Sequence, residues 1–477
     1  MYGEDLRREM KQLQGDMNCR LSKIELRNFK NTEYGIVEMP SFANKEYFSR
    51  NADILGIYGQ NGSGKTAVVE CISILKNLLE GKTLPANVKN YIAQTSETCQ
   101  LRIWFTVEFN GVKSLLEYKV ELGEISKEQT GIITEELFAS EYSGKSFKRK
   151  KLIIGYSSEK GKSFVTPDKL YKDLVKLREE SSVDMMVARR ITQREGVSFI
   201  FGDDMNRVFE LSKDVLGVCS GVIKALRDYA AYDLFVISNV RESHDHNICL
   251  IPVLSGAEDK KEESRKYFVP VDEPFVLEKS KFVFFENILK KMNTVICTII
   301  PGLNIDIHSF GEQLMENGKE GVKVQLVSKR GDVTIPLKYE SEGIIKIISL
   351  LNLLMCVYNN PFMCLVADEL DAGIYEYLLG ELLSVFRRGA KGQLLFTSHN
   401  LRALEMLDKT SVIFSTVNPE NRYIRLKNVR NSNLRDIYLR SIILGGQDEE
   451  IYDETDAIEM GRAFRSAGKA VRSEEQN

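Results

Sequence analysis

The chain has 477 residues and a formal net charge of −3, with 43 % hydrophobic and 28 % charged residues. The length leaves room for one large domain or about two to three ordinary ones. The composition is typical of a soluble globular protein, and the small net charge excludes a global positive field that would attract nucleic acid. No apolar run approaches the roughly 20 residues of a membrane span, the N-terminus lacks the apolar core of a signal peptide, and the eight cysteines form no CxxC pair. We therefore expect a cytoplasmic protein with reduced thiols and no membrane segment.

The N-terminal part of the chain reads as strands around one helix. Residues 21–38 alternate apolar and polar side chains on either side of a polar turn, which predicts a strand hairpin. The apolar run 53–58 predicts a buried strand, and residues 67–79 have the spacing of an amphipathic helix. A second hairpin is predicted at 101–122, around an Asn-Gly turn. The remaining strands of this antiparallel meander are predicted at 131–142 and 151–155.

A complete Walker A loop, G-Q-N-G-S-G-K-T, lies between the predicted strand and helix, from Gly59 to Thr66. Its glycines let backbone N–H groups surround a phosphate, and the helix N-terminus adds the positive end of its dipole. Lys65 is expected to reach the β- and γ-phosphates, and the Thr66 hydroxyl to bind Mg²⁺. The alternative is a glycine turn with an unrelated lysine, which the flanking strand and helix argue against. The predicted nucleotide-binding residues of this loop are Gly59, Asn61, Gly62, Ser63, Gly64, Lys65 and Thr66.

The pattern changes in the middle of the chain. Residues 167–231 have helical spacing, and residues 232–274 are mixed. The charged stretch 258–266 is interpreted as a solvated loop or an insertion. Helices are predicted at 278–299 and 342–358, and strands at 303–308, 321–328 and 333–339.

A Walker B element follows the last of these helices. The continuous apolar run 361–367 predicts a central strand of a parallel sheet, and it ends in Asp368 and Glu369. Asp368 is expected to bind Mg²⁺, and Glu369 to polarise the attacking water. A second apolar strand ends in His399, which we interpret as a sensor of the γ-phosphate. Taken alone, the two acids could be a solvated strand end, and His399 a capped surface residue.

Ser341 and Gly343 open the helix that precedes the Walker B strand. One interpretation is a plain N-cap, with Ser341 over the first turn. The other is a second anion site, because a serine, a glycine and a helix N-terminus can hold a phosphate. In the predicted order of elements this site does not reach the phosphates of its own Walker A loop. It would reach those of a second copy of the chain.

These motifs together resemble the ABC-type ATPase heads of the SMC, RecF and OLD group, and in particular the compact OLD-related prokaryotic AAA-type ATPases. The matching positions are the opening Ile24–Lys30, Walker A at Gly59–Thr66, the signature at Ser341–Gly343, Walker B at Asp368 and Glu369, the D-loop at Asp371, and His399. The resemblance implies that ATP and Mg²⁺ are bound between two heads, with Walker A of one facing the signature of the other. It also implies that Asp371 contributes to nucleotide binding.

The implied fold is α/β: a P-loop NTPase head of the ABC-ATPase type with an antiparallel β subdomain and a mainly helical insertion. We expect the N-terminal half of the head at 20–165, a helical or mixed insertion at 166–300, the C-terminal half of the head at 301–432 and a tail at 433–477. The stretch after His399 is too short, and lacks the acidic pattern, for the TOPRIM nuclease that OLD proteins carry.

The resemblance leaves two functions open. In the first, the chain is a Mg²⁺-dependent ATPase whose ATP-driven homodimer or higher oligomer controls a separate effector, such as a toxin or nuclease, as the sensor of a prokaryotic anti-phage defence system. In the second, it is a DNA-binding repair ATPase of the RecF or SMC type, so nucleic acid is a possible partner. A self-contained nuclease is disfavoured, because His244-Asp-His246 is a weak metal-binding pattern.

Two further segments bear on the choice of partner. The basic segment 145–151 contains an aromatic residue, which suits nucleic acid, although a solvated turn is the alternative. The tail contains an amphipathic helix at 434–444 and an acidic stretch at 448–456. This helix could bind a partner or pack on its own head.

Overall fold

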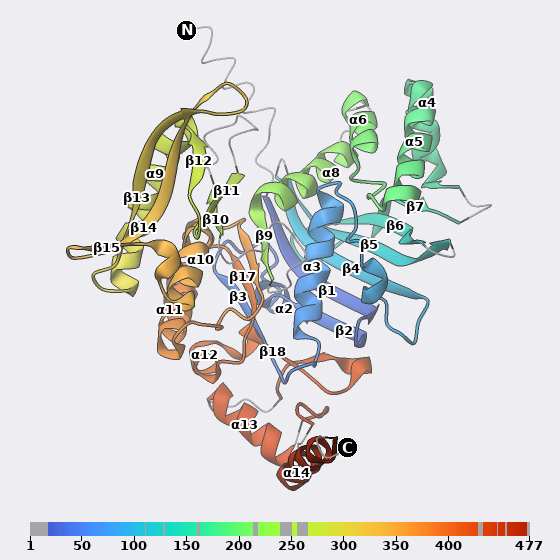
Figure 1. Cartoon of the computed structure of the whole chain (residues 1–477). Helices are drawn as coiled ribbons and strands as arrows, with labels where there is room; N and C mark the ends of the chain where they lie inside the picture. The colour runs from blue at the N-terminus through green and yellow to red at the C-terminus, as the bar shows by residue number, and fades with distance from the viewer. Residues whose placement is uncertain are drawn as a thin grey trace.

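The computed structural model describes residues 18–474 except 110, 127–128, 160–162, 213–217, 239–249, 255–265, 428–432, 446 and 454–455. A six-stranded central sheet and a seven-stranded antiparallel sheet enclose helix α3 (Lys65–Leu79), and a layer of helices covers the outer face of the central sheet. Figure 1 shows α3 in front of the antiparallel sheet and beside the strands of the central sheet. The predicted α/β class, with an antiparallel β subdomain and a helix-rich insertion, is confirmed. The predicted cluster His244-Asp-His246 and most of the charged stretch 258–266 lie outside the described residues.

The central sheet has six strands and carries the candidate site. In spatial order they are β19 (Tyr423–Ile424), β18 (Val412–Ser415), β3 (Asp53–Tyr58), β17 (Gln393–Thr397), β16 (Cys364–Ala367) and β9 (Leu234–Ile237). All neighbours pair in parallel except β18 with β19. Every residue of β3, β16, β17 and β18 is buried, as expected for strands covered on both faces. The carboxyl ends of β3, β17 and β16 therefore meet at one edge of the sheet.

The second large sheet is antiparallel and has seven strands. They are, in spatial order, β2 (Thr32–Glu38), β1 (Asn18–Phe29), β4 (Thr98–Phe109), β5 (Val112–Ser126), β6 (Gln129–Glu141), β7 (Lys151–Ser157) and β8 (Val165–Thr166). The two predicted hairpins and the meander are confirmed. Alternate side chains of β1 and β4 pack with α3 in one core, so this sheet fixes the helix that follows the Walker A loop.

The opposite face of the central sheet is covered by α10 (Glu342–Asn359), α11 (Glu376–Gly389), α12 (Leu401–Met406) and α13 (Leu434–Leu444). Within the described part of the chain, α10 is the one helix long and apolar enough to span a membrane. Half of its apolar window is buried inside the protein, and core helices commonly pass the same test. α10 also packs in a second core with residues 285–296 of the preceding long helix, so it links two parts of the molecule.

The middle of the chain forms two lobes, which rise on either side of the central sheet in Figure 1. One contains α4 (Asp168–Leu177), α5 (Glu180–Glu195), α6 (Asp203–Leu211) and α8 (Val218–Asp228). The other contains β10 (Leu250–Leu254), β11 (Lys266–Pro270), β12 (Phe275–Glu278), α9 (Lys279–Ile299), β13 (Asn304–Leu314), β14 (Glu320–Arg330) and β15 (Val333–Pro336). Short helical turns lie at α2 (Pro40–Ala43), η1 (Val88–Tyr91), η2 (Tyr229–Asp233), η4 (Leu337–Tyr339), η5 (Lys409–Ser411) and η6 (Pro419–Asn421).

The predicted domain boundaries at 165, 300 and 432 stay predictions, and one strand pairing links two of the predicted domains. β9 comes from the predicted insertion, yet it pairs with β16 and forms an edge of the central sheet. Its four residues carry too little local pattern to reveal a pairing partner about 130 positions further along the chain.

The tail packs partly on its own head. Leu434 and Tyr438 of α13 are buried, and the Tyr438 ring stacks on Phe414 of β18 with centroids 4.8 Å apart. Within the described part of the acidic stretch, Ile451 is buried and the Asp453 N–H donates to Gln60 Oε1 at 3.0 Å. A further helix, α14 (Ala457–Glu474), was not predicted from the sequence. Its described apolar side chains are exposed, so no packing against the head reinforced its pattern.

Candidate nucleotide-binding site

The Walker A loop has the conformation that its glycines permit. Gly59, Gly62 and Gly64 have φ values of 155°, 78° and 93°. A Cβ added at Gly59 would lie 2.0 Å from Ser415 Oγ, so the neighbouring strand also requires glycine there. Helix α3 begins directly at Lys65, with Gly64 at its N-cap. The free N–H groups of its first turn therefore lie at the loop, where an anion can be bound.

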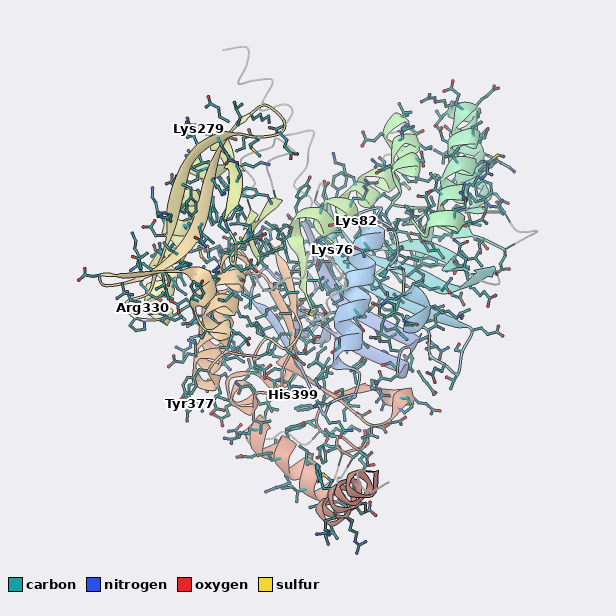
Figure 2. The ribbon with its side chains drawn as sticks, viewed as in Figure 1. Lys76, Lys82, Lys279, Arg330, Tyr377 and His399 are labelled. Carbon is teal, nitrogen blue, oxygen red and sulfur yellow. The ribbon has the colours of Figure 1, made fainter. Side chains whose placement is uncertain are left out.

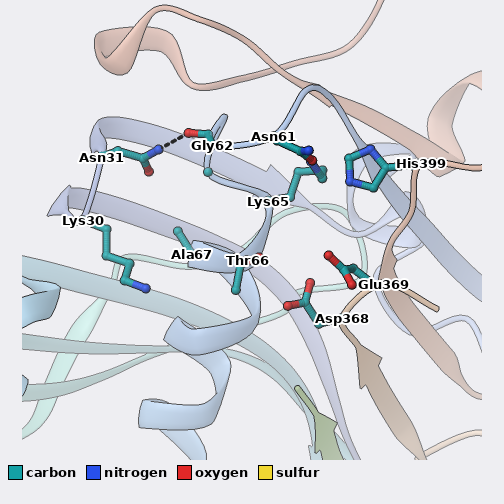
Figure 3. A pocket seen from close by; sticks show the side chains of 11 residues that line it. Lys30, Asn31, Asn61, Gly62, Lys65, Thr66, Ala67, Asp368, Glu369 and His399 are labelled. Carbon is teal, nitrogen blue, oxygen red and sulfur yellow. Dashed lines mark hydrogen bonds between the residues drawn. The ribbon is translucent and has the colours of Figure 1, made fainter. Parts of the chain in front are cut away.

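One pocket brings residues of the two Walker motifs and His399 together. It has a volume of about 400 Å³. Figure 3 shows Lys65, Glu369 and His399 around the same space, with Asp368 beside Thr66. The lining residues are Lys30, Asn31, Asn61, Gly62, Gly64, Lys65, Thr66, Ala67, Asp368, Glu369 and His399. The predicted residues Gly59, Ser63, Ser341, Gly343 and Asp371 do not line it. Their roles, like those of the lining residues, stay predictions.

The side chain of Lys65 folds back onto the carbonyl oxygens of its own loop. Its Nζ donates hydrogen bonds to the carbonyl oxygens of Gly59 and Gln60 at 2.9 and 2.8 Å. Burial lowers the pKa of Lys65, while the carboxylates of Asp368 and Glu369 act in the opposite direction. The ammonium is thus held at the mouth of the loop, next to the position where phosphate oxygens would lie.

Asp368 and Thr66 supply oxygen ligands that suit Mg²⁺. Asp368 Oδ1 accepts a hydrogen bond of 2.6 Å from Thr397 Oγ1, which fixes the carboxylate. Burial raises the pKa of Asp368, and its hydrogen bonds to Thr397 and Thr66 oppose this shift. Mg²⁺ commonly binds to one or two protein oxygens together with substrate phosphates and waters. The side chains at this position therefore fit a nucleotide-bound Mg²⁺.

Glu369 is held in an unusual backbone conformation. Its φ is 46°, in the left-handed region that residues other than glycine rarely adopt. Its N–H donates to Thr397 Oγ1 at 2.7 Å, and its carbonyl oxygen accepts from Ala372 N at 3.0 Å. Strained conformations of this kind persist where surrounding contacts determine them, and they occur often at functional sites. The turn directs the Glu369 side chain into the pocket (Figure 3).

His399 lines the same pocket as Lys65, and its main chain is held by Asp371 of the D-loop. Asp371 Oδ2 accepts a hydrogen bond of 3.0 Å from the backbone N–H of His399. In this single chain, Asp371 thus holds the switch segment and does not contact the pocket. Burial lowers the pKa of His399 and the Lys65 ammonium lowers it further, while the carboxylates of Asp371, Glu369 and Asp368 oppose this shift, so the net effect favours the neutral imidazole. A neutral ring can donate one N–H to a phosphate oxygen.

The signature residues lie outside the pocket, at an exposed helix end. Ser341 caps α10, since its Oγ accepts a hydrogen bond from Ile344 N at 3.4 Å. Ser341 and Glu342 are exposed, so this N-terminus faces solvent. Gly343 lies against the D-loop, where an added Cβ would be 2.0 Å from the Gly373 carbonyl oxygen. Close packing is thus a sufficient reason for glycine at this position.

Three pocket or support residues were given no role from the sequence. Lys30 and Asn31 come from the turn between β1 and β2, and Asn31 Nδ2 donates to the Gly62 carbonyl oxygen (Figure 3). Lys30 Nζ is paired with Glu70 Oε1 at 2.6 Å. The polar run N-F-K-N between two strands was the available signal. Thr397, which supports both acids, lies within an apolar strand and gave no signal.

Comparisons with known proteins give likenesses of fold. No protein-family model matches the sequence, and no curated protein matches it significantly. The structure is similar to an Smc head domain from Pyrococcus furiosus, bound to the C-terminal domain of ScpA, with 12 % identity over 86 % of this chain and 96 % of that one and a TM-score of 0.40. It is similar to an SMC head domain from Thermotoga maritima, with 13 % identity over 86 % and 99 % and a TM-score of 0.36. The recombination mediator protein RecF-ATPrS gives 11 % identity over 87 % and 100 %, with a TM-score of 0.36. Identities this low relate folds alone, and the strand order and loops described above establish the fold independently.

Proposed function

We propose that the chain is a Mg²⁺-dependent ATPase that converts ATP and water into ADP and phosphate. One observation carries this proposal: a single pocket combines a glycine loop at a helix N-terminus with Lys65, Thr66, Asp368, Glu369 and His399. Phosphoryl transfer needs positioning and charge stabilisation more than covalent chemistry, and these groups supply both.

Each residue has a defined part in the proposed reaction. The loop N–H groups and Lys65 hold the β- and γ-phosphates. Glu369 orients the attacking water and accepts its proton, while neutral His399 donates a hydrogen bond to a γ-phosphate oxygen. Mg²⁺, when bound by Thr66 and Asp368, neutralises charge on the phosphates.

The proposed site is completed by a second copy of the chain. The exposed N-terminus of α10, with Ser341, would face the γ-phosphate held by the partner's loop. Large aromatic side chains around it support such an interface. Tyr339 is 68 % exposed and Tyr375 is 70 % exposed, and the ring centroid of Tyr377 (Figure 2) lies 5.7 Å from that of Tyr375. Exposed aromatic residues commonly act as anchors in protein interfaces.

The proposal includes control of a separate effector, as the sensor subunit of a prokaryotic anti-phage defence pair. This part follows from the resemblance to compact OLD-related ATPases. A surface on the tail supports partner binding, because Met460 and Phe464, four residues apart on one face of α14, are exposed, Phe464 by 80 %. Amphipathic helices of this kind commonly lay their apolar face in a partner's groove.

A second function, DNA binding, is favoured by one specific surface. Five rings from two neighbouring loops contact one another and are partly exposed: Phe42, Tyr47, Phe48, Tyr142 and Phe147. Beside them, Lys145, Arg149 and Lys151 are exposed and form no ion pair within the described residues. Aromatic rings next to unpaired cations suit single-stranded nucleic acid.

Lys65→Ala should abolish most ATP binding and hydrolysis, because it removes the charge that faces the β- and γ-phosphates. The measurement is steady-state phosphate release together with nucleotide binding by calorimetry. Lys82→Ala, an exposed lysine beyond the C-terminal end of the same helix, is the matched control and should retain activity. Hydrolysis at the wild-type rate in Lys65→Ala would show that the pocket is not the ATPase site.

Glu369→Gln should bind ATP, hydrolyse it slowly and accumulate as a dimer or higher oligomer. The amide keeps the size of the side chain but cannot accept the proton from water. Light scattering with ATP, with ADP and without nucleotide measures the oligomer. An unchanged turnover rate would exclude Glu369 as the base. A variant that binds ATP but stays monomeric would exclude binding of ATP between two copies of the chain.

The two partner classes can be separated by DNA binding with purified protein and by gene deletion in cells. DNA binding predicts that Lys145→Glu combined with Arg149→Glu weakens single-stranded DNA binding by about tenfold or more at low salt. Effector control predicts negligible DNA binding by the wild type, and loss of phage protection when the neighbouring gene is deleted. Protection that persists with every neighbour deleted, or cleavage of nucleic acid by the purified chain with Mg·ATP, contradicts effector control.

A further inference from the structure

Lys346 lies one turn inside α10, the helix that Ser341 caps, and its side chain reaches the turn that contains Glu369. It is 6 % exposed. Its Nζ donates a hydrogen bond of 2.6 Å to the carbonyl oxygen of Glu369. The same ammonium faces the carboxylates of Asp371, Glu369 and Asp368. A buried cation thus lies close to Asp368 and Glu369, two of the residues that line the pocket.

The main chain of Glu369 depends on a small set of contacts. Its left-handed φ of 46° is unfavourable for a glutamate and needs support. Thr397 Oγ1 holds its N–H, while Ala372 N and Lys346 Nζ both donate to its carbonyl oxygen. Of these three contacts, the Lys346 bond is the one that carries charge, and charged hydrogen bonds are the stronger kind.

The position of the ammonium is itself fixed. Gly343, on the same helix, packs against Gly373 so closely that an added Cβ would lie 2.0 Å from its carbonyl oxygen. α10 is therefore locked against the turn formed by residues 368–373. The Lys346 side chain, leaving the helix one turn later, meets Glu369 from a defined direction.

We propose that Lys346 is a positioning residue for hydrolysis, which holds the main chain of Glu369 so that its carboxylate faces the nucleotide. This inference rests on the proposed role of Glu369 as the base. Lys346 acts through Glu369 and does not line the pocket. Its loss should therefore impair the chemical step more than nucleotide binding, because a displacement of the base by a fraction of an ångström is enough to slow a positioned reaction.

A second buried lysine provides a matched control for a structural role. Lys76 of α3 is also 6 % exposed, and its Nζ donates to the carbonyl oxygens of Ala230 and Leu234 at 2.8 and 2.6 Å. It lies outside the residues that line the pocket, and Figure 2 shows it well apart from His399. Both lysines thus bind main-chain carbonyls in the core, but only one of these carbonyls belongs to the proposed base.

Lys346→Met and Lys76→Met should differ in kinetics. Lys346→Met should lower kcat by about 10- to 100-fold and leave KM and ATP affinity within about twofold of wild type. Lys76→Met should lower the melting temperature but keep kcat per folded molecule. Lys346→Arg, which retains a charged donor, should recover part of the lost kcat. An unchanged kcat in Lys346→Met, or a change confined to KM, would overturn the inference.

A double mutant separates positioning from general destabilisation. If Lys346 acts through Glu369, adding Lys346→Met to Glu369→Gln should slow single-turnover hydrolysis no further than Glu369→Gln alone. Losses that multiply would overturn the inference. If Lys346→Met does not fold, Lys346→Gln and Lys346→Arg allow the same comparison. Absence of hydrolysis by the wild type would contradict the proposed function itself, whereas wild-type hydrolysis with an unaffected Lys346→Met contradicts only the role of Lys346.

Discussion

The alignment of three parallel strands is the constraint on which the rest of the structure depends. β17 pairs with β3 on one side and with β16 on the other, so that Thr397 lies level with Ile57 and Phe396 with Ala367. This register brings the ends of the three strands to one edge, where the Walker A loop, the Walker B acids and the switch segment begin. A slip of one residue would turn every side chain of a strand to its opposite face. It would also separate Asp368 from the hydroxyl of Thr397.

The same edge concentrates negative charge, and the fold balances it. Asp368, Glu369 and Asp371 lie within one turn, and after burial the nearby carboxylate of Glu369 also raises the pKa of Asp368. Lys65 approaches them from the Walker A side and Lys346 from α10. Burial lowers the pKa of both lysines, while these carboxylates raise it. The two ammonium groups and the three acids thus attract one another, and this arrangement is in place before a nucleotide arrives.

Site residues could be predicted from the sequence where a chemically distinctive motif follows a clear local pattern of secondary structure. The loop Gly59–Thr66 and the acid Asp368 follow continuous apolar strands, so both position and chemistry could be read locally. The position of the edge strand β9 could not be predicted in this way, because it depends on pairing with a strand far along the chain. Lys346 was noted only as the last residue of the signature-like stretch S-E-G-I-I-K, and its role could not be read from the sequence, because its partner is a main-chain carbonyl. The helix α14 has no packing face in the described structure, so neither burial nor a capping pattern marked it in advance.

The central claim is that each ATP site combines the loop of one copy with the signature of another. Gly343 is unsuited to testing this, because a side chain there would collide with Gly373 of its own D-loop. Ser341→Asp is better, since aspartate keeps the N-cap but places a negative charge toward the partner's γ-phosphate. The most direct measurement is ATP hydrolysis by a mixture of Lys65→Ala and Ser341→Asp chains. Each variant alone should be inactive, and the mixture should recover up to roughly a quarter of wild-type activity, because half of randomly paired dimers contain one intact site. No recovery at any ratio, with mixed dimers shown to form, would contradict the composite site.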